Sequence, residues 1–200
     1  MANDDAGISD VRLYGFMANH VEPYRHKIPD LVAESSGEKR RRDSSLPCYP
    51  RRMAKRNQSE ITLCLFSDTH ELHRDIEMPE ASLYLCAGDF TTFSRAMAAV
   101  RDFDAWLGEL GAPVVLTAGN HESFLEADPS KRSLLPNATM LINQSARIAG
   151  IKILGLPVVP LAGTAFGMPS AAERRRVYST IPDDTDIIIT HVTYCKWRGY

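Results

Sequence analysis

Four apolar runs in this sequence each end in residues that can bind a metal ion. The runs are I-T-L-C-L-F, S-L-Y-L-C-A, P-V-V-L-T-A and D-I-I-I-T. The residues that follow them are Asp68 and His70, then Asp89, then Asn120 and His121, and finally His191. Each alone also fits a turn after a strand, where Asp and Asn are favoured. Because carboxylates and imidazoles are costly to bury without a partner, their repetition at four strand ends indicates one shared site.

The geometry of a parallel sheet explains how residues so far apart in sequence can meet. Parallel strands bring their carboxyl ends to the same edge of the sheet, which is where sites form in α/β proteins. Asp68 and His70 are two positions apart, so both face the same side of an extended segment. Gly88 and Gly119 precede candidate ligands, and glycine permits the tight turn that directs the next side chain inward.

The donor types indicate the chemistry of the site. A set of carboxylate, imidazole and amide-oxygen donors suits Mn, Fe or Zn rather than a thiolate site. Asp89 is the candidate for a shared carboxylate that bridges two divalent metal ions about 3.5–4 Å apart. Such a pair binds a phosphoryl group and lowers the pKa of a bridging water until hydroxide forms near neutral pH. His121 is the candidate catalytic residue, which would protonate the leaving oxygen or stabilise the developing charge.

Three residues are candidates for binding the substrate. Asn120 and His121 lie in the block after the third apolar run, and His73 follows closely on the first. His73 fits an exposed surface position as well as it fits the mouth of the site. Glu122 is interpreted as the start of a helix rather than as an acid catalyst.

The pattern of apolar residues indicates that an α/β core positions these residues. Apolar runs rich in β-branched residues predict strands at 61–66, 82–87, 113–118, 150–156 and 186–190. The runs at 139–142 and 146–150 are predicted to pair with 150–156 as a meander. Between residues 93 and 111 apolar residues recur at helical spacing, which predicts a helix that ends at Gly111. Continuous apolar strands are typical of parallel strands that are buried on both faces.

The chain changes in composition near residue 59. Residues 1–59 are polar and turn-rich, and residues 39–56 hold eight basic residues against one acid, Asp43. Such a stretch buries too little apolar surface to offset its ordering entropy, so we expect a largely disordered extension before a folded domain at 60–200 that carries the candidate site. The first thirty residues are predicted to add a short helix around Leu13, Tyr14 and Phe16. The basic segment is interpreted as a solvated tail, with a nuclear-localisation or nucleic-acid patch as the alternative.

Composition and charge narrow the class of partner. A net charge of −2 over 200 residues provides no electrostatic argument for nucleic acid or an anionic membrane. No apolar run approaches the roughly 20 residues that span a bilayer, and the opening M-A-N-D-D does not resemble a secretory signal. The four cysteines form no C-x-x-C pair, which fits a reducing compartment. We therefore expect a cytoplasmic protein, or a nuclear one if the basic segment acts as a signal. Its expected partner, a small phosphoester or nucleotide, follows from the donor set described above and not from composition.

Taken together and in order, the blocks S-D-T-H, A-G-D-F, G-N-H-E and I-I-I-T-H resemble those of the calcineurin-like metallophosphoesterase family. Asp89 follows Asp68 by 21 positions and Asn120 follows Asp89 by 31, which is also similar to the family. S-D-T-H-E-L-H-R and G-I-K-I-L-G-L-P-V-V-P resemble the branch of metallophosphoesterase-domain-containing proteins and related phosphodiesterases. The resemblance covers roughly residues 60–191.

The resemblance implies a fold and a role for each candidate residue. The implied fold is a sandwich of two β-sheets flanked by helices. Asp68 and His70 would bind one divalent cation, Asp89 would bridge, and Asn120 and His191 would bind the other. His121 would contact the phosphate. The branch resemblance favours a cyclic nucleotide or another small phosphodiester as substrate.

The sequence departs from the family pattern after His191. The family normally closes with a Gly-His-x-His block, whereas here T-H continues into V-T-Y-C-K-W-R-G-Y. Three interpretations stay open: a fragment or mis-spliced product, a truncated protein that has lost ligands, or a site that another chain completes. We favour the first. Valine codons begin with the two nucleotides that begin most introns, so read-through of an intron at Val192 would produce such a tail. We expect weaker metal binding and a sheet incomplete at the C-terminus with uncovered edges, and hence a chain that alone is poorly soluble or nearly inactive.

Two other functions compete with hydrolysis. The first is a catalytically impaired metallophosphoesterase-like fold that serves as a binding or scaffold protein. The second is a nucleic-acid-associated protein that uses the basic segment at 39–56, which salt-dependent DNA binding would test. The fold does not determine the natural substrate.

Overall fold

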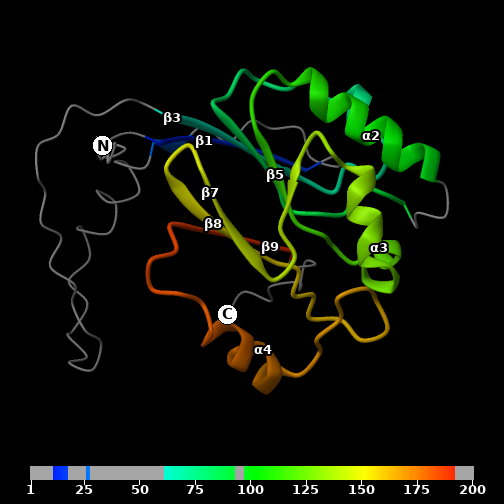
Figure 1. Cartoon of the computed structure of the whole chain (residues 1–200), viewed down its shortest axis with the longest axis vertical. Coiled ribbons are helices and arrows are strands. Elements are labelled where there is room, and N and C mark those ends of the chain that lie inside the picture. The colour runs from blue at the N-terminus through cyan, green and yellow to red at the C-terminus, as the bar shows by residue number, and fades with distance from the viewer. Residues whose placement is uncertain (1–10, 18–25, 28–60, 93–96, 192–200) are drawn as a thin grey trace, which may run out of the picture.

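The apolar runs form two sheets in a computed structural model that describes residues 11–17, 26–27, 61–92 and 97–191 (Figure 1). The larger sheet contains β1 (Val11–Met17), β2 (His26–Lys27), β3 (Ile61–Ser67), β4 (Leu83–Cys86), β5 (Val114–Leu116) and β6 (Thr139–Met140), in the order β2-β1-β3-β4-β5-β6. The smaller sheet has the order β7-β8-β9, with β7 (Gln144–Ile148), β8 (Ile151–Leu156) and β9 (Ile187–Thr190). The helices are α2 (Met97–Glu109), α3 (Ser123–Ala127) and α4 (Ala171–Tyr178), with 3-10 turns η1 (His73–Asp75) and η2 (Pro129–Leu134).

The two sheets face each other, and helices cover their outer faces. The outer face of the larger sheet packs against α2 through a cluster that includes Cys64, Phe66, Cys86, Val100, Phe103, Trp106 and Leu107. The inner cluster joins the sheets and includes Leu63, Leu83, Leu85, Val115, Ile151, Ile153 and Ile189. On the far side of the smaller sheet, Leu154, Leu156 and Val158 contact Val177 of α4. The predicted α/β class, two sheets flanked by helices, is confirmed.

Strand pairing directs the carboxyl ends of several strands to one edge. β3 runs parallel to β4, and β4 runs parallel to β5. In the smaller sheet β9 runs parallel to β8. β4 is buried along its whole length, as expected for a strand covered on both faces. This arrangement brings the turns after β3, β4, β5 and β9 together.

The predicted helix between residues 93 and 111 is confirmed over Met97–Glu109. Its buried residues Val100, Phe103, Trp106 and Leu107 form the face that packs on the larger sheet. Gly111 has a φ of +72°, a backbone conformation that favours glycine and ends the helix as predicted. Residues 93–96 of the predicted helix lie outside the described residues.

The N-terminal prediction was wrong for residues 11–17, which form a strand and not a short helix. β1 pairs in parallel with β3 from Val11 opposite Ile61 to Met17 opposite Ser67, so the sheet extends across the predicted boundary at residue 59. The run V-R-L-Y-G-F-M is rich in residues that favour strands, and this signal was available in the sequence. The basic segment at 39–56 and the rest of the predicted extension lie outside the described residues.

The predicted meander was correct for one of its two pairs. β7 pairs antiparallel with β8, as expected. β6 instead pairs in parallel with β5, Val115 opposite Thr139 and Leu116 opposite Met140, and so belongs to the other sheet. Sequence proximity favoured a hairpin, but the turn at 141–143 carries the chain from one sheet to the other. Within the described ranges, no helix is long and apolar enough to cross a membrane.

Candidate metal centre

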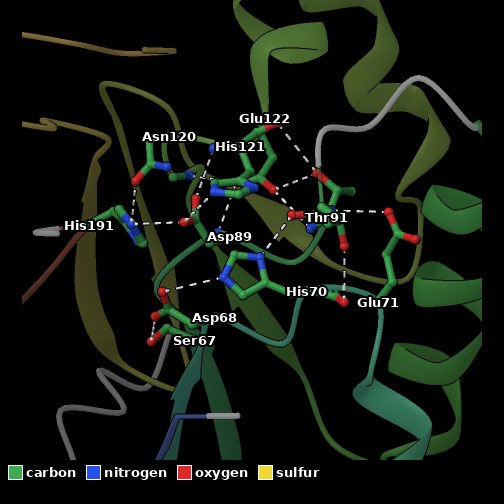
Figure 2. Close-up of polar contacts among 12 residues, drawn as sticks. Ser67, Asp68, His70, Glu71, Asp89, Thr91, Asn120, His121, Glu122 and His191 are labelled. Atoms are coloured by element: carbon green, nitrogen blue, oxygen red, sulfur yellow. Dashed lines mark hydrogen bonds and ion pairs between the residues drawn. The ribbon is translucent and has the colours of Figure 1, made fainter. Parts of the chain in front are cut away.

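The six residues that follow the four apolar runs lie together at one edge of the two sheets (Figure 2). Asp68 and His70 come from the turn after β3, Asp89 from the turn after β4, Asn120 and His121 from the turn after β5, and His191 from the end of β9. These residues include two groups of three in which each residue offers one donor atom, and within each group those atoms lie within 4.8 Å of one another. We call them the first triad, His70, Asp89 and His121, and the second triad, Asp68, Asp89 and His191.

Asp89 is the member that both triads share. Its carboxylate is 2% exposed. Oδ1 accepts a hydrogen bond from the backbone amide of His121 at 2.9 Å. Oδ2 lies 3.3 Å from Nε2 of His191 and 3.8 Å from Nε2 of His121. One carboxylate therefore faces an imidazole from each triad, which is the geometry expected of a bridging ligand.

The backbone of these turns adopts conformations that few residues tolerate. Positive φ values occur at Asp68 (54°), His70 (43°), Glu71 (67°) and Asp89 (53°). Each such non-glycine residue costs free energy and persists only where the surroundings enforce it. The enforcement comes from three hydrogen bonds of 3.0, 3.1 and 3.0 Å, which run from the amides of Asp68, His70 and Glu71 to the carbonyls of Gly88, Asp89 and Phe90. Strain concentrated in this way is typical of functional sites.

Backbone carbonyls set the orientation of two of the histidines. Nδ1 of His70 donates to the carbonyl of Thr91 at 3.2 Å, and Nδ1 of His191 donates to the carbonyl of Ala87 at 2.9 Å. A carbonyl only accepts, so the proton of each neutral ring sits on Nδ1 and Nε2 carries the lone pair. Metal-binding histidines are commonly held in this way, because the bond at one nitrogen presents the other to the metal.

The acceptor atoms around His191 provide a test of whether a cation fits. Nε2 of His191 lies 3.2 Å from Oδ1 of Asn120 and 3.3 Å from Oδ2 of Asp89. With Nδ1 as the donor to Ala87, three acceptor atoms point at one another in a buried place. Such a group is stable only if a positive charge, a cation or a proton, lies among them. The residues present therefore fit a divalent cation, whose mixed oxygen and nitrogen donors suit Mn, Fe or Zn.

The pKa shifts at this point agree with that electrostatic picture. Burial alone would lower the pKa of His191, but the hydrogen bond and the charge of Asp89 outweigh burial and raise that pKa above its usual value. For Asp89, burial acts to raise the pKa, and the contacts with His191 and the His121 amide overcome it and lower the pKa. A proton on His191 and a bound cation would therefore compete for the same position.

The structure groups the donors differently from the assignment that the resemblance implies. That assignment pairs Asp68 with His70 on one cation, whereas Asp68 lies with His191 and His70 lies with His121. Oδ1 of Asp68 and Nε2 of His70 are 3.9 Å apart, and the rings of His70 and His121 have centroids 4.6 Å apart. The roles of individual ligands stay predictions.

His73 requires a correction, because it lines neither the site mouth nor the surface. It is 2% exposed and packs against Phe103 and Trp106 of α2. Its Nε2 contacts Oδ2 of Asp102 at 2.9 Å. η1 turns this side chain away from the triads and into the core, and local sequence carried no signal for that direction. His73 therefore holds η1 against α2, and its predicted contact with substrate is withdrawn.

Glu122 lies beside the triads, and sequence reasoning missed the contacts of its side chain. It immediately precedes α3, as its interpretation as a helix-start residue predicted, but its side chain is fully buried. Oε2 accepts from the amides of Gly119 and Asp89 at 2.7 and 2.9 Å, and Oε1 accepts from the amide and hydroxyl of Thr91 at 3.1 and 2.9 Å. Burial raises the pKa of Glu122 to about 6, against the effect of the backbone donors. The available signal was an acid placed between a turn and the apolar residues of α3.

A hollow of about 600 Å³ lies apart from this centre, beside β8. Leu154, Leu156, Phe166 and Met168 are among the residues that line it. It shares no residue with either triad. The metal centre and this hollow are therefore separate features of the molecule.

Comparison with known proteins supports the family resemblance. Residues 61–193 match the family model described as calcineurin-like phosphoesterase. The human and mouse proteins named metallophosphoesterase domain-containing protein 1 are each 30% identical over 151 residues, which cover 62% of this chain and 46% of the relative. A UPF0046 protein of Caenorhabditis elegans is 25% identical over 146 residues, which cover 66% of this chain and 50% of the relative. The chain thus spans about half the length of the curated relatives that it matches.

Proposed function

This chain belongs to the calcineurin-like phosphoesterase family, and on that basis we propose that it is a metal-dependent hydrolase of phosphoric ester bonds. The observation that supports the proposal best is the position of Asp89. Its buried carboxylate is common to two groups of donors, each drawn from turns that are distant in sequence. A shared carboxylate between two donor groups is the arrangement on which two-cation phosphoester chemistry depends.

Donors from the two triads would hold the two divalent cations, with His121 left to act on the phosphate. Asp68, Asp89 and His191 would hold one, together with the amide oxygen of Asn120, and His70 and Asp89 would hold the other. When bound, the cations supply Lewis-acid polarisation of the phosphoryl oxygens and lower the pKa of a nearby water. Mn, Fe or Zn suits this donor set.

The remaining chemistry falls to side chains of the turn after β5. Nε2 of His121 lies on the Asp89 side of the centre, 3.8 Å from Oδ2, and the ring is only partly buried. A proton held at Nε2 can be donated to the leaving oxygen, or it can stabilise negative charge on the phosphoryl group. The amide of Asn120 keeps its oxygen towards His191, which leaves its NH₂ group to donate to a phosphoryl oxygen.

The substrate class is a small phosphomonoester or phosphodiester, with nucleotides as one possibility. The name of the human and mouse relatives specifies a metallophosphoesterase domain and no substrate. An impaired enzyme that binds metal or ligand without turnover is the alternative, and the experiment below separates the two.

The test is metal analysis combined with hydrolysis of a generic aryl phosphodiester. The wild-type chain is expected to hold two equivalents of Mn²⁺ at saturating concentration and to hydrolyse the ester slowly, in line with the low activity expected from the sequence. Asp89→Asn is expected to lose both cations and all turnover, because it removes the donor that the triads share. The matched control is Asp184→Asn, since Asp184 is an exposed carboxylate that pairs with Lys152.

The outcomes distinguish the proposal from its alternative. A metal-loaded wild-type chain without turnover would support the binding or scaffold role. Metal content unchanged in Asp89→Asn, or no metal in the wild type, would contradict the two-cation centre.

A further inference from the structure

We propose that Glu122 is a positioning residue that aligns the first triad, and so controls binding of the cation held by His70 and Asp89. The inference rests on the proposed function, since it concerns the same centre. Glu122 touches neither substrate nor reacting atoms in this proposal. It acts through the backbone of the turns that carry the ligands.

The carboxylate of Glu122 joins two turns that are far apart in sequence. Oε2 accepts from the amide of Gly119, in the turn after β5, and from the amide of Asp89, in the turn after β4. Oε1 accepts from the amide and the hydroxyl of Thr91, also in the turn after β4. Figure 2 shows Glu122 above Thr91, with its contacts directed into this turn. The buried Glu122 side chain therefore sets the distance between the turn after β4 and the turn after β5.

The contacts continue from Glu122 to each member of the first triad. The carbonyl of Thr91 accepts from Nδ1 of His70, so the placement of Thr91 sets the direction of that ring. The amide of Asp89 is held directly, and its Oδ1 accepts from the amide of His121. His121 is also the neighbour of Glu122 in sequence. All three donors of the first triad are thus oriented through Glu122.

Asp68 and His191, the two members of the second triad that the first triad does not share, are oriented by contacts that do not involve Glu122. Nδ1 of His191 donates to the carbonyl of Ala87, and the amide of Asp68 donates to the carbonyl of Gly88. Only Asp89 is common to both groups. Loss of the Glu122 carboxylate should therefore weaken the two cation positions unequally.

A glutamine cannot replace this carboxylate. Each of its oxygens receives at least one backbone N–H, from Gly119 and Asp89 on one side and from Thr91 on the other. Backbone amides cannot reverse to accept a hydrogen bond. In Glu122→Gln the NH₂ group would face one of these donors whichever way it turned, so one turn would have to move.

The experiment is titration of the metal-free protein with Mn²⁺ by calorimetry, together with EPR detection of spin coupling between the two ions. In the wild type we expect two sites and a coupled signal. In Glu122→Gln we expect one site to weaken about 10–100-fold, the range typical when a residue that orients ligands is lost. We expect the other site to change by no more than about threefold, and the coupled signal to appear only at higher Mn²⁺.

The control is Glu126→Gln, in the same short helix. Glu126 is exposed and accepts one backbone hydrogen bond, from Phe166, at 2.8 Å. Both Mn²⁺ sites should be unchanged in this variant. Thr91→Val provides a second, milder test, because it keeps the backbone donor and removes the hydroxyl, which donates to Oε1 at 2.9 Å and lies 3.5 Å from the carbonyl of His121. Loss of one hydrogen bond should weaken the same site by about three- to tenfold.

The possible failures are distinguishable. Two unchanged sites in Glu122→Gln, or equal weakening of both, would overturn the inference while leaving the proposed function intact. If Glu122→Gln does not fold, unchanged binding by Thr91→Val would overturn the inference, and selective weakening of one site would support it. Absence of Mn²⁺ binding in the wild type would overturn the proposed function and this inference together.

Discussion

Gly119 lies directly against the carboxylate of Asp89, at a distance that leaves no room for a side chain. A Cβ atom on Gly119 would overlap Oδ1 of Asp89 and would also crowd its backbone nitrogen. The glycine was predicted to permit a tight turn. Its observed role is to leave space for the shared carboxylate, because the turn after β5 packs directly against the turn after β4.

Gly119→Ala should therefore displace Asp89 and weaken metal binding. We expect a loss of about tenfold or more in Mn²⁺ affinity, with about 1–3 kcal/mol of destabilisation from overpacking. Calorimetric titration and chemical unfolding measure the two effects. Gly108→Ala, in α2, is the matched control, because the atoms nearest to a Cβ there belong to the side chain of Asn137, the nearest of them at 3.1 Å. Equal Mn²⁺ affinity in Gly119→Ala and wild type would show that Asp89 does not depend on this contact.

His121→Ala should reduce turnover and keep both cations. The prediction follows from assigning Nε2 of His121 to the phosphate rather than to a metal. The expected loss of turnover is about 10²–10⁴-fold, the usual contribution of one proton-transferring group. Measuring bound Mn²⁺ on the same sample separates the two roles. A drop to one equivalent would reassign His121 as a ligand of the first triad.

The buried imidazole of His73 should make the fold sensitive to acid. Burial lowers its pKa below the ordinary value of 6.5, against the opposing effects of Asp102 and Glu71 and with a smaller contribution from Arg74. Nδ1 of His73 makes no hydrogen bond within the part of the chain that the structure describes, so a proton there would be a buried donor without a partner. In this pH range the unfolded chain binds more protons than the folded one. Stability should be full above pH 6.5 and should fall as pH drops towards the lowered pKa.

The comparison variant for this prediction is His73→Gln, which keeps a donor towards Asp102 but cannot be charged. Unfolding free energies of both proteins are measured from about pH 7.5 to about pH 5, the range in which histidine titrates. The unfolding free energy of the wild type should fall relative to that of His73→Gln as pH falls. A difference in unfolding free energy that stays constant across this pH range would contradict the prediction.

The exposed side of β9 should promote self-association. Ile188 is 44% exposed, and within the described ranges β9 has a strand neighbour only on its β8 side. Leu65 adds exposed apolar surface at 37%, but its strand β3 lies between β1 and β4 and is not an edge. Open edges with apolar residues favour pairing with other chains. The poor solubility expected from the sequence stays a prediction, and these residues identify where it would arise.

Ile188→Lys should therefore reduce aggregation, as measured by light scattering at matched concentrations. Its unfolding free energy should stay within about 0.5 kcal/mol of the wild type, because the side chain already faces solvent. Ile189→Lys, one position along, is the contrasting control: Ile189 is 5% exposed, and a buried lysine there should unfold the protein. Unchanged scattering in Ile188→Lys would place the association surface elsewhere.

Much of the site could be predicted from the sequence because its signal is local. Asp68, Asp89, Asn120 and His191 each stand at the end of an apolar run, and a run with a polar end needs only neighbouring residues to be recognised. The rule that parallel strands share one carboxyl edge then brings the four together. α2 was predictable for the same reason, since its apolar face repeats within 13 residues.

The tertiary structure decided which groups these local elements meet. The sequence placed Glu122 at the start of a helix and His73 near the first block. Only the folded chain shows that Glu122 accepts hydrogen bonds from backbone amides 31 and 33 residues away. Only the folded chain shows that His73 contacts Asp102, which lies 29 residues further along the sequence. Likewise, β6 pairs with β5 and not with β8, the strand predicted as its partner. The physical reason is that periodicity reports how a segment buries its own apolar side chains, whereas a hydrogen-bond partner depends on which segments pack side by side.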